Sequence, residues 1–365
     1  MLTAVTPGTA AITADAVKQI AHECGFELAG IAAALPAADY SRYREWVEAG
    51  MAGEMTYLTD HRGEIRSDPE NLLPGAQTIL CVGKLYNSPY PYSTEISDCD
   101  RAWISRYAWG DDYHDVLRSG LDRVAGRLHA LSPTEFDHRI CIDTAPLLER
   151  SYARLAGLGW IGRNTCLINE GRGSWFFLGE LLLTLDLPAD HPPPDRCGTC
   201  RRCIDACPTE AIVAKPDGTW TLDARLCISY LTIEKRGPID PPQHAGTGPH
   251  VFGCDICQDV CPWNRKAPET LERAFQPKSF APHLERLAAL TPEEFRAMFR
   301  ETPIWRTKYA GFLRNVAITM GNSRNAKFRA ALERLAKNED SSVAGAAQAA
   351  LDRCTELQRD SLVQG

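Results

Sequence analysis

The first half of the chain alternates between two periodicities of apolar residues. Apolar positions 17, 20, 21 and 24 have the spacing of an amphipathic helix that begins near Thr13 and ends at Gly25. The segments 40–49, 113–131 and 147–158 show the same helical pattern. Apolar runs of strand length occupy 26–35, 78–85, 139–143 and 175–187. This mixture of strands and helices predicts an α/β domain over residues 15–190.

The strand pattern disappears after residue 264. Apolar stripes at helical spacing follow at 313–320, 328–335 and 343–354, with Ser341 and Ser342 as the expected cap of the last helix. Paired helices of this length resemble a HEAT-like repeat. Pro- and Gly-rich stretches mark the changes of pattern. We therefore predict a flexible N-terminus (1–14), an α/β domain (15–190), a cysteine-rich module (191–265) and an all-helical domain (266–365).

Length and composition exclude several classes of protein. A chain of 365 residues, 44% hydrophobic and 24% charged, can form two or three domains and is not disordered, collagen-like or of low complexity. No stretch approaches the ~18–20 apolar residues of a membrane-spanning helix. Residues 1–14 lack the basic and apolar regions of a secretory signal. A cytoplasmic location is expected, where 14 cysteines indicate metal binding or redox chemistry.

Eight of the cysteines lie between residues 197 and 261, at spacings typical of two four-iron clusters. The first run is Cys-x2-Cys-x2-Cys-x3-Cys-Pro and the second is Cys-x2-Cys-x3-Cys-Pro, with one cysteine between them. In such runs three thiolates bind one cubane, and the cysteine before proline reaches the other cluster. We predict that residues 191–265 form a ferredoxin-like module with two [4Fe-4S] clusters, one held by Cys197, Cys200, Cys203 and Cys261, and a second held by Cys207, Cys227, Cys254 and Cys257.

Zinc is the main alternative for these cysteines, because Cys-x2-Cys repeats also bind Zn²⁺. Zinc ribbons do not need the run that ends in x3-Cys-Pro, so the cluster interpretation is favoured. The remaining six cysteines are isolated and are interpreted as small buried apolar residues: Cys24, Cys81, Cys99, Cys141, Cys166 and Cys354.

The charge of the chain is distributed unevenly. From Arg296 to Lys337 there are ten basic and two acidic residues, a charge of +8 in a chain whose net charge is −7, which leaves −15 on the remainder. Concentrated basic charge interleaved with aromatic residues favours nucleic acid as a partner, without distinguishing RNA from DNA. The alternative is an ordinary solvated helix face. The candidate contacts are Arg306, Lys308, Arg314, Arg324, Lys327 and Arg329.

Several motifs resemble those of the epoxyqueuosine reductases, the cobalamin-dependent iron–sulfur enzymes of queuosine tRNA modification. The resemblance extends from about residue 29 to 352 and includes the eight cysteines. The matching segments are GEMTYL (53–58), Arg66 with LLPGA (72–76), SRYAWGDDYH (105–114), IDTAPLLER (142–150), GWIGRN (159–164), GSWFFLGE (173–180), CISYLTIE (227–234), GCDICQDVCPWN (253–264) and LRNVA (313–317).

The resemblance implies a function and its partners. Two clusters would feed a cobalamin bound in the α/β domain, and the epoxide of epoxyqueuosine would be reduced to the alkene of queuosine, with the oxygen leaving as water. The substrate would be the wobble base of the tRNAs for Asp, Asn, His and Tyr, in the last step of queuosine biosynthesis. The implied partners are the tRNA anticodon stem-loop, bound by the C-terminal helices, and an external low-potential electron donor. A monomer is expected.

Asp143 is the candidate catalytic acid. In the family this role belongs to the Asp of the IDTAP-like motif, and Asp143 ends an apolar strand, where ligand sites lie in α/β sheets. Apolar walls and a large cofactor are expected to raise its pKa, so that it is protonated near neutrality. The alternative is a cap on the following helix.

Cofactor contacts are weaker candidates, because the chain has no Asp-x-His-x-x-Gly element and cobalamin is implied by the resemblance alone. His114 is a candidate cobalt ligand or a hydrogen-bonded structural residue. The full set of candidate cofactor or pocket contacts is Arg66, Tyr113, His114, Asn164, Ser174 and Trp175.

Two other functions were compared with this one. Reductive dehalogenases share the cobalamin and cluster arrangement, but they commonly carry a twin-Arg export signal, and Arg201-Arg202 lie inside the cluster motif here. They also do not need a basic C-terminal segment. A non-enzymatic electron-transfer or RNA-binding protein would not need a large α/β domain before its clusters.

Overall fold

The N-terminal half of the protein is built on a four-stranded sheet. The computed structural model describes residues 12–363, with side chains as far as residue 354. The strand order is β1-β2-β7-β4, and all three pairings are antiparallel. The rule that places ligand sites at the carboxyl ends of parallel strands therefore does not apply, and that part of the argument for Asp143 was wrong. The strands are β1 Leu28–Ala33, β2 Thr78–Leu85, β4 His138–Cys141 and β7 Phe176–Leu183.

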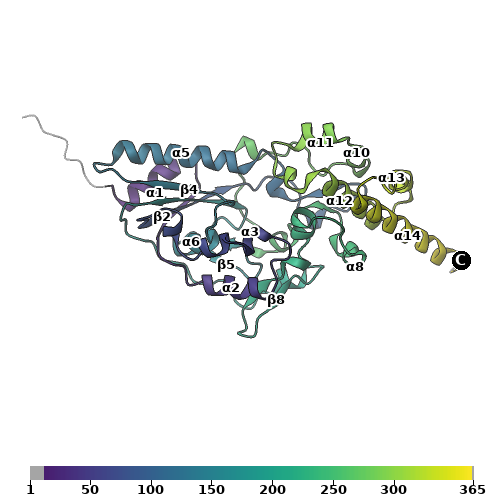
Figure 1. Cartoon of the computed structure of the whole chain (residues 1–365), viewed down its shortest axis with the longest axis horizontal. Helices are drawn as coiled ribbons and strands as arrows, with labels where there is room; N and C mark the ends of the chain where they lie inside the picture. Colours follow the sequence, from purple (N-terminus) through teal and green to yellow (C-terminus); the bar gives the residue numbers. More distant parts are fainter. Residues whose placement is uncertain (1–11, 364–365) are drawn as a thin grey trace, which may run out of the picture.

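Helices cover both faces of this sheet (Figure 1). Because side chains alternate along a strand, Leu80 and Val82 of β2 pack in one core with α1 and α5, whereas Ile79 and Cys81 pack in another with α6. The helices predicted at 113–131 and near 14–24 are confirmed, and the helix predicted at 147–158 is shorter at both ends. Their bounds are α1 Ala14–Glu23, α5 Tyr113–Leu131 and α6 Glu149–Leu155.

Shorter elements connect the sheet to the cysteine-rich segment. The helix predicted at 40–49 is confirmed as α2, and the cysteine runs are held in short turns and helices. A segment of π-helix, Tyr230–Glu234, follows Cys227. The remaining bounds are α2 Tyr40–Glu48, α3 Thr56–Thr59, α4 Arg62–Ile65, β3 Trp103–Ile104, β5 Trp160–Ile161, β6 Leu167–Ile168, α7 Arg202–Asp205, β8 Ile212–Ala214, β9 Trp220–Leu222, α8 Pro241–His244, β10 His250–Phe252 and α9 Ile256–Asp259.

The C-terminal part is helical, and among the described residues no strand follows Asn264. Its helices lie at the end of the molecule opposite α1 and α5 (Figure 1). The side chain of Asp340, rather than Ser341 or Ser342, accepts the first amide hydrogen bonds of the last helix. The helices are α10 Leu284–Ala288, α11 Pro292–Phe299, α12 Lys308–Ser323, α13 Arg329–Leu335 and α14 Ser341–Val363.

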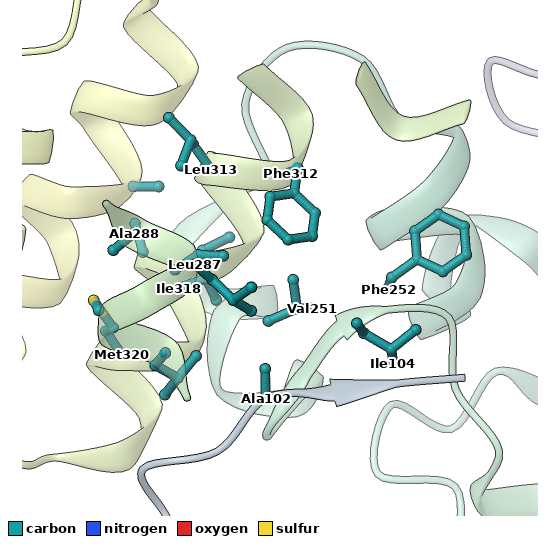
Figure 2. Close-up of a cluster of buried hydrophobic side chains, with 14 of the residues drawn as sticks. Ala102, Ile104, Val251, Phe252, Leu287, Ala288, Phe312, Leu313, Ile318 and Met320 are labelled. Atoms are coloured by element: carbon teal, nitrogen blue, oxygen red, sulfur yellow. The ribbon is translucent and has the colours of Figure 1, made fainter. Parts of the chain in front are cut away.

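The largest core joins the last three of the four predicted segments. Ala102 and Ile104 from segment 15–190 and Val251 and Phe252 from segment 191–265 pack against Phe312 and other residues of α10 and α12 (Figure 2). The boundaries predicted at 190/191 and 265/266 are therefore not boundaries between separate hydrophobic cores. Of the predicted N-terminal segment 1–14, residues 1–11 lie outside the described part of the chain.

Within residues 12–363, no helix combines the length and the apolar character needed to cross a membrane.

Candidate active site

Four of the eight predicted ligands face one cavity. Cys197, Cys200, Cys203 and Cys261 line a space of about 320 Å³, together with Arg163, Arg196 and Arg202. Cys261 comes from the second cysteine run, 64 positions after Cys197 in the printed sequence, and reaches this cavity because α9 ends just before it. Burial and the Cys197 thiol raise the pKa of Cys261 to about 11. The set that faces this cavity is the one predicted from the crossed ligand pattern.

The other four predicted ligands do not line this cavity. Burial and the nearby thiols of Cys227 and Cys207 raise the pKa of Cys254. Burial also raises the pKa of Cys227, and the Cys207 thiol adds to this effect. Since like-charged thiolates raise each other's pKa only at short range, these cysteines form a second group that is distinct from the first.

Cys166 lies beside the second group and was not singled out from the sequence. A hydrogen bond with Cys257 lowers the pKa of Cys166 and raises that of Cys257. Its interpretation as a simple buried thiol was incomplete, because no spacing signal relates position 166 to the later run. Cys99 is exposed, so the same interpretation was wrong there, whereas Cys24, Cys81 and Cys141 are buried.

Asp143 lines another cavity, of about 450 Å³. Its backbone has a φ of 46°, which is rare for a residue other than glycine, and its N–H donates to Glu149 Oε1 at 2.5 Å. On the carboxyl side, Oδ2 lies 3.4 Å from His114 Nε2 and 3.7 Å from Arg306 Nη1. The side chain is 41% exposed. Asp143 is therefore not a simple cap on α6: its carboxyl group faces the cavity between two cationic side chains.

These two neighbours shift the pKa of Asp143 in the direction opposite to the one predicted. Burial acts to raise the pKa, as the sequence argument expected. The His114 imidazole and the Arg306 guanidinium act in the opposite direction and prevail, so the pKa lies below its usual value. The prediction of a protonated carboxyl near neutrality is wrong for this arrangement, because two cationic side chains stand beside the carboxyl group.

His114 is protonated where Asp143 is ionised. Its Nδ1 lies 2.7 Å from Oδ1 of Asp112, the residue that caps α5. Burial lowers the pKa of His114, but the contacts with Asp112 and Asp143 outweigh it and raise the pKa to about 9. The imidazole is therefore a cation at neutral pH. Its Nε2 is buried, and its contact with Asp143 lacks hydrogen-bond geometry.

Several lining residues of this cavity were not singled out from the sequence. Arg306 was predicted as a tRNA contact, yet its Nε donates to Glu234 Oε1 at 2.7 Å and its guanidinium lies over the Tyr57 ring. Tyr57 belongs to the GEMTYL motif and Glu234 ends the CISYLTIE motif, so the motifs marked the segments without indicating which side chains meet. The cavity is also lined by Tyr107, Asp112, Tyr113, Ile233, Arg300, Thr302, Pro303 and Trp305.

Comparison with known proteins identifies this arrangement. A model described as "Epoxyqueuosine reductase QueG, DUF1730" matches residues 66–144, and one described as "4Fe-4S double cluster binding domain" matches residues 196–264. The epoxyqueuosine reductase of Xanthomonas campestris is 42% identical over 313 residues, covering 84% of this chain and 86% of that protein. The chain belongs to the epoxyqueuosine reductase family. The Escherichia coli epoxyqueuosine reductase is 37% identical, covering 85% of this chain and 81% of its own length.

Solved structures of this family have the same fold. A crystal structure of epoxyqueuosine reductase with an epoxyqueuosine-modified tRNA-Tyr stem loop matches with a TM-score of 0.84 and 26% identity, over 93% of this chain and 89% of that one. The Bacillus subtilis enzyme, with its catalytic Asp loop swung out of the active site, matches with a TM-score of 0.83 and 26% identity, over 93% and 90%. The protein is thus an oxidoreductase of this family with a double [4Fe-4S] domain.

The six residues predicted as cofactor contacts of the epoxyqueuosine reductase fall into two groups. Tyr113 and His114 line the Asp143 cavity, and the Tyr113 ring stacks on Phe177 at 4.3 Å between centroids. Of the other four, Asn164 lines the cavity of the first cysteine group, and Arg66, Ser174 and Trp175 have structural contacts. Arg66 donates to the backbone oxygens of Tyr57 and Arg62, Asn164 donates to Cys257 O, Ser174 donates to Gln258 Oε1, and Trp175 is fully buried beside Tyr86 and Tyr92.

The residues predicted as tRNA contacts are of two kinds, one buried and the others at the surface. Arg314 is 0% exposed, and its guanidinium donates to the backbone oxygens of Leu231 and Lys235, among others. Its prediction as a surface contact was wrong, because a charge count cannot distinguish an exposed arginine from one that binds backbone carbonyls. Lys308 is exposed beside the Trp305 ring, Lys327 pairs with Asp100, and Arg329 pairs with Glu333; Arg324 is exposed.

Proposed function

We propose that this protein reduces epoxyqueuosine to queuosine at the wobble position of the tRNAs for Asp, Asn, His and Tyr. The observation that carries the proposal is the Asp143 carboxyl group, which faces a cavity lined on one side by α5 and on the other by Ile233 and Glu234. The latter two residues belong to the π-helix that follows Cys227, a ligand of the second predicted cluster. An acid and an electron source would therefore meet at one cavity, as reductive removal of an oxygen requires.

The proton balance defines what the side chains must do. Converting an epoxide to an alkene takes up two electrons and two protons, and the oxygen leaves as water. Asp143 is ionised near neutrality, so the nearest available proton is on His114, 3.4 Å from its carboxyl oxygen. We infer that Asp143 and His114 act as one proton-donating unit, with Asp143 facing the departing oxygen. Arg306 would stabilise negative charge that develops there.

Cobalamin belongs to the proposal as the cofactor of this cavity. The walls include the rings of Tyr57, Tyr107, Tyr113 and Trp305, which suit a flat and largely apolar macrocycle. These rings fit the group, and Tyr113 and His114 are the predicted contacts that would line it. Because His114 is protonated beside Asp143 in this proposal, it would contact the group and would not serve as a cobalt ligand. When bound, cobalamin would supply a reduced cobalt as nucleophile or electron donor.

The proposal also includes several features that we predicted from the sequence. These are the HEAT-like character of the C-terminal helices, the division into segments 1–14, 15–190, 191–265 and 266–365, a monomeric state, a cytoplasmic location and an external low-potential electron donor. The eight cysteines are proposed as the cluster ligands in the two crossed groups. Membership of the epoxyqueuosine reductase family favours this function over a reductive dehalogenase, and it leaves zinc without support.

Anaerobic incubation of the cluster-loaded protein with cobalamin, a reductant and epoxyqueuosine-containing tRNA tests the function directly. Mass analysis of the nucleosides should show queuosine in place of epoxyqueuosine. Omitting cobalamin is the matched control and should abolish the conversion. Conversion without cobalamin, or no conversion with every component present and eight irons bound, would overturn the proposal.

The activity should depend on the proton of His114. Because its pKa is raised from 6.5 to about 9, the imidazole is fully protonated below the ordinary pKa and loses its proton as the pH rises through about 9. The rate of a single turnover at saturating tRNA should be constant through neutrality and fall above about pH 9. In His114→Gln that alkaline limb should disappear and the rate should be lower throughout. An unchanged alkaline limb in the variant would assign it to another group.

The surface basic residues of the C-terminal helices should contribute to tRNA binding. Lys308→Glu/Arg324→Glu is the preferred variant, since both residues are exposed, Arg314 is buried, and Lys327 and Arg329 are paired with Asp100 and Glu333. We expect weaker binding and a shallower dependence of log Kd on log salt, by roughly one for each phosphate that the protein no longer neutralises. The matched control is Arg42→Glu/Arg118→Glu, which changes the net charge equally at exposed positions elsewhere. Equal weakening in both variants would indicate only a general charge effect.

The loop that carries Asp143 is inferred to move. The related Bacillus subtilis structure has its catalytic Asp loop swung out of the active site. In this chain residues 142–148 connect β4 to α6, and we infer that they exchange between an inward and an outward position. The inward position is the one described above, in which the Asp143 carboxyl lies beside His114.

A further inference from the structure

Two carboxyl groups that the proposed chemistry does not use lie behind Asp143, between the sheet and α6. Glu180 stands opposite Cys81 of β2 and Cys141 of β4, and its side chain is 0% exposed. Neither of its carboxyl oxygens receives a hydrogen bond of ordinary geometry from the described residues. A carboxyl group in this position destabilises the fold unless another group compensates for it.

Glu149 is the group that faces Glu180. It is the first residue of α6, and Asp143 and Glu180 are the carboxyl groups that act on it. Its Oε1 accepts the N–H of Asp143 at 2.5 Å. Asp143 has the unfavourable φ of 46°, and two hydrogen bonds hold it there: this one, and the one that the Thr144 N–H donates to Ile142 O across the residue. Glu149 thus connects the buried Glu180 to the backbone of the proposed acid.

The charged groups around Glu149 and Glu180 decide how many protons the two carboxyl groups hold together. Glu149 lies near Asp143 and Arg150. Glu180 lies near Glu149 and Asp143, and beside the thiols of Cys81 and Cys141. His114 and Arg306 balance the charge of Asp143, and Arg150 is the cation that acts on Glu149. Ionising both the half-buried Glu149 and the buried Glu180 would therefore place two like charges side by side against one arginine. Burial raises the pKa of both Glu149 and Glu180, in agreement with this argument. If Glu149 donates its proton to Glu180 in a hydrogen bond, its second oxygen can still accept the Asp143 N–H.

We propose that Glu149 and Glu180 share one proton as a carboxylic acid–carboxylate pair that fixes the Asp143 loop in its inward position. Glu149 is a positioning residue: it contacts the backbone of Asp143 and acts on the reaction through it. Glu180 fixes the Glu149 carboxyl from below. This proposal adds a positioning device to the proposed function. It depends on that function only in taking Asp143 as the catalytic acid.

Variants of Glu149 test the positioning role. Glu149→Gln keeps an oxygen that accepts the Asp143 N–H and should retain most of the activity. Glu149→Ala removes that oxygen, and kcat should fall by about tenfold or more while KM for tRNA stays constant. Hydrogen–deuterium exchange of the peptide 140–150 in the substrate-free protein should be faster in Glu149→Ala alone. The control is Glu48→Ala, a surface carboxyl in a different helix. Unchanged exchange and kcat in Glu149→Ala would overturn the positioning role.

Infrared spectroscopy of the substrate-free protein tests the shared proton. At neutral pH the difference spectrum between the protein and Glu149→Gln/Glu180→Gln should contain the band of a protonated carboxyl group. The buried Asp255 and Asp259, whose pKa values are also raised, contribute equally to both proteins and cancel. Both substitutions are close to isosteric, which keeps the core filled. Absence of the band from the difference spectrum would overturn the shared proton. If the enzyme instead failed to form queuosine while the band and the exchange behaved as expected, the proposed function would fail and the carboxyl pair would stand.

Discussion

Asp143→Asn should abolish measurable turnover of epoxyqueuosine, with a loss of roughly 10²–10⁴-fold. The amide has the shape of the carboxyl group, but it cannot take the proton of His114 and pass it to the departing oxygen. The backbone hydrogen bond to Glu149 does not involve the substituted atoms, so the loop should keep its position. Single-turnover measurement with epoxyqueuosine-containing tRNA and nucleoside mass analysis gives the rate.

Two measurements separate this loss from damage to the rest of the protein. Iron content and tRNA affinity of Asp143→Asn should equal those of the unmodified protein, because Asp143 does not line the cavity of Cys197, Cys200, Cys203 and Cys261. Asp112→Asn is an informative companion. It weakens the contact that keeps His114 protonated and should lower the apparent alkaline pKa rather than remove activity. Full activity in Asp143→Asn would remove Asp143 from the mechanism.

Single cysteine substitutions should remove whole clusters in a crossed pattern. The unmodified protein should contain about eight irons per chain. Cys261→Ala should reduce the content to about four by loss of the first cluster, and Cys207→Ala should do the same by loss of the second. The reason is the partition seen in the fold: Cys261 faces the cavity of Cys197, Cys200 and Cys203, whereas Cys207 lies with Cys227 and Cys254.

Double substitutions distinguish this pattern from an uncrossed one. Cys197→Ala/Cys261→Ala should lose no more iron than either single change, because both residues would hold the same cluster. Cys207→Ala/Cys261→Ala should lose nearly all of it. Cys203→Ala/Cys207→Ala should also lose nearly all of its iron, because the crossed pattern places these two residues in different clusters. An uncrossed pattern places both in one cluster and predicts the loss of that cluster alone. Cys24→Ala, at a buried cysteine outside both groups, is the control and should leave iron content unchanged.

The segments of the fold with strong local signals were predictable from the sequence. The periodicity of 113–131 and the apolar run of 78–85 correspond to α5 and β2 with the same bounds. Weaker signals failed at the ends: the last helix is capped by Asp340 rather than by the serines after it. Strand pairing was not predictable, because an antiparallel and a parallel sheet can carry similar apolar runs. That ambiguity led to the wrong reason for choosing Asp143, although the residue does face a cavity.

The sequence by itself determined the chemistry that depends on short separations along the chain. Cysteine spacing indicated two clusters and a crossed ligand pattern, and the motif around Asp143 indicated the proposed acid. Tertiary structure decided whatever depends on distances through space. It placed His114 and Arg306 beside Asp143 and so lowered a pKa that was expected to rise. It also buried Arg314 against backbone carbonyls and brought Glu180 behind the Asp143 loop. Electrostatic effects follow spatial neighbours, and no local pattern in the sequence records which distant residues these are.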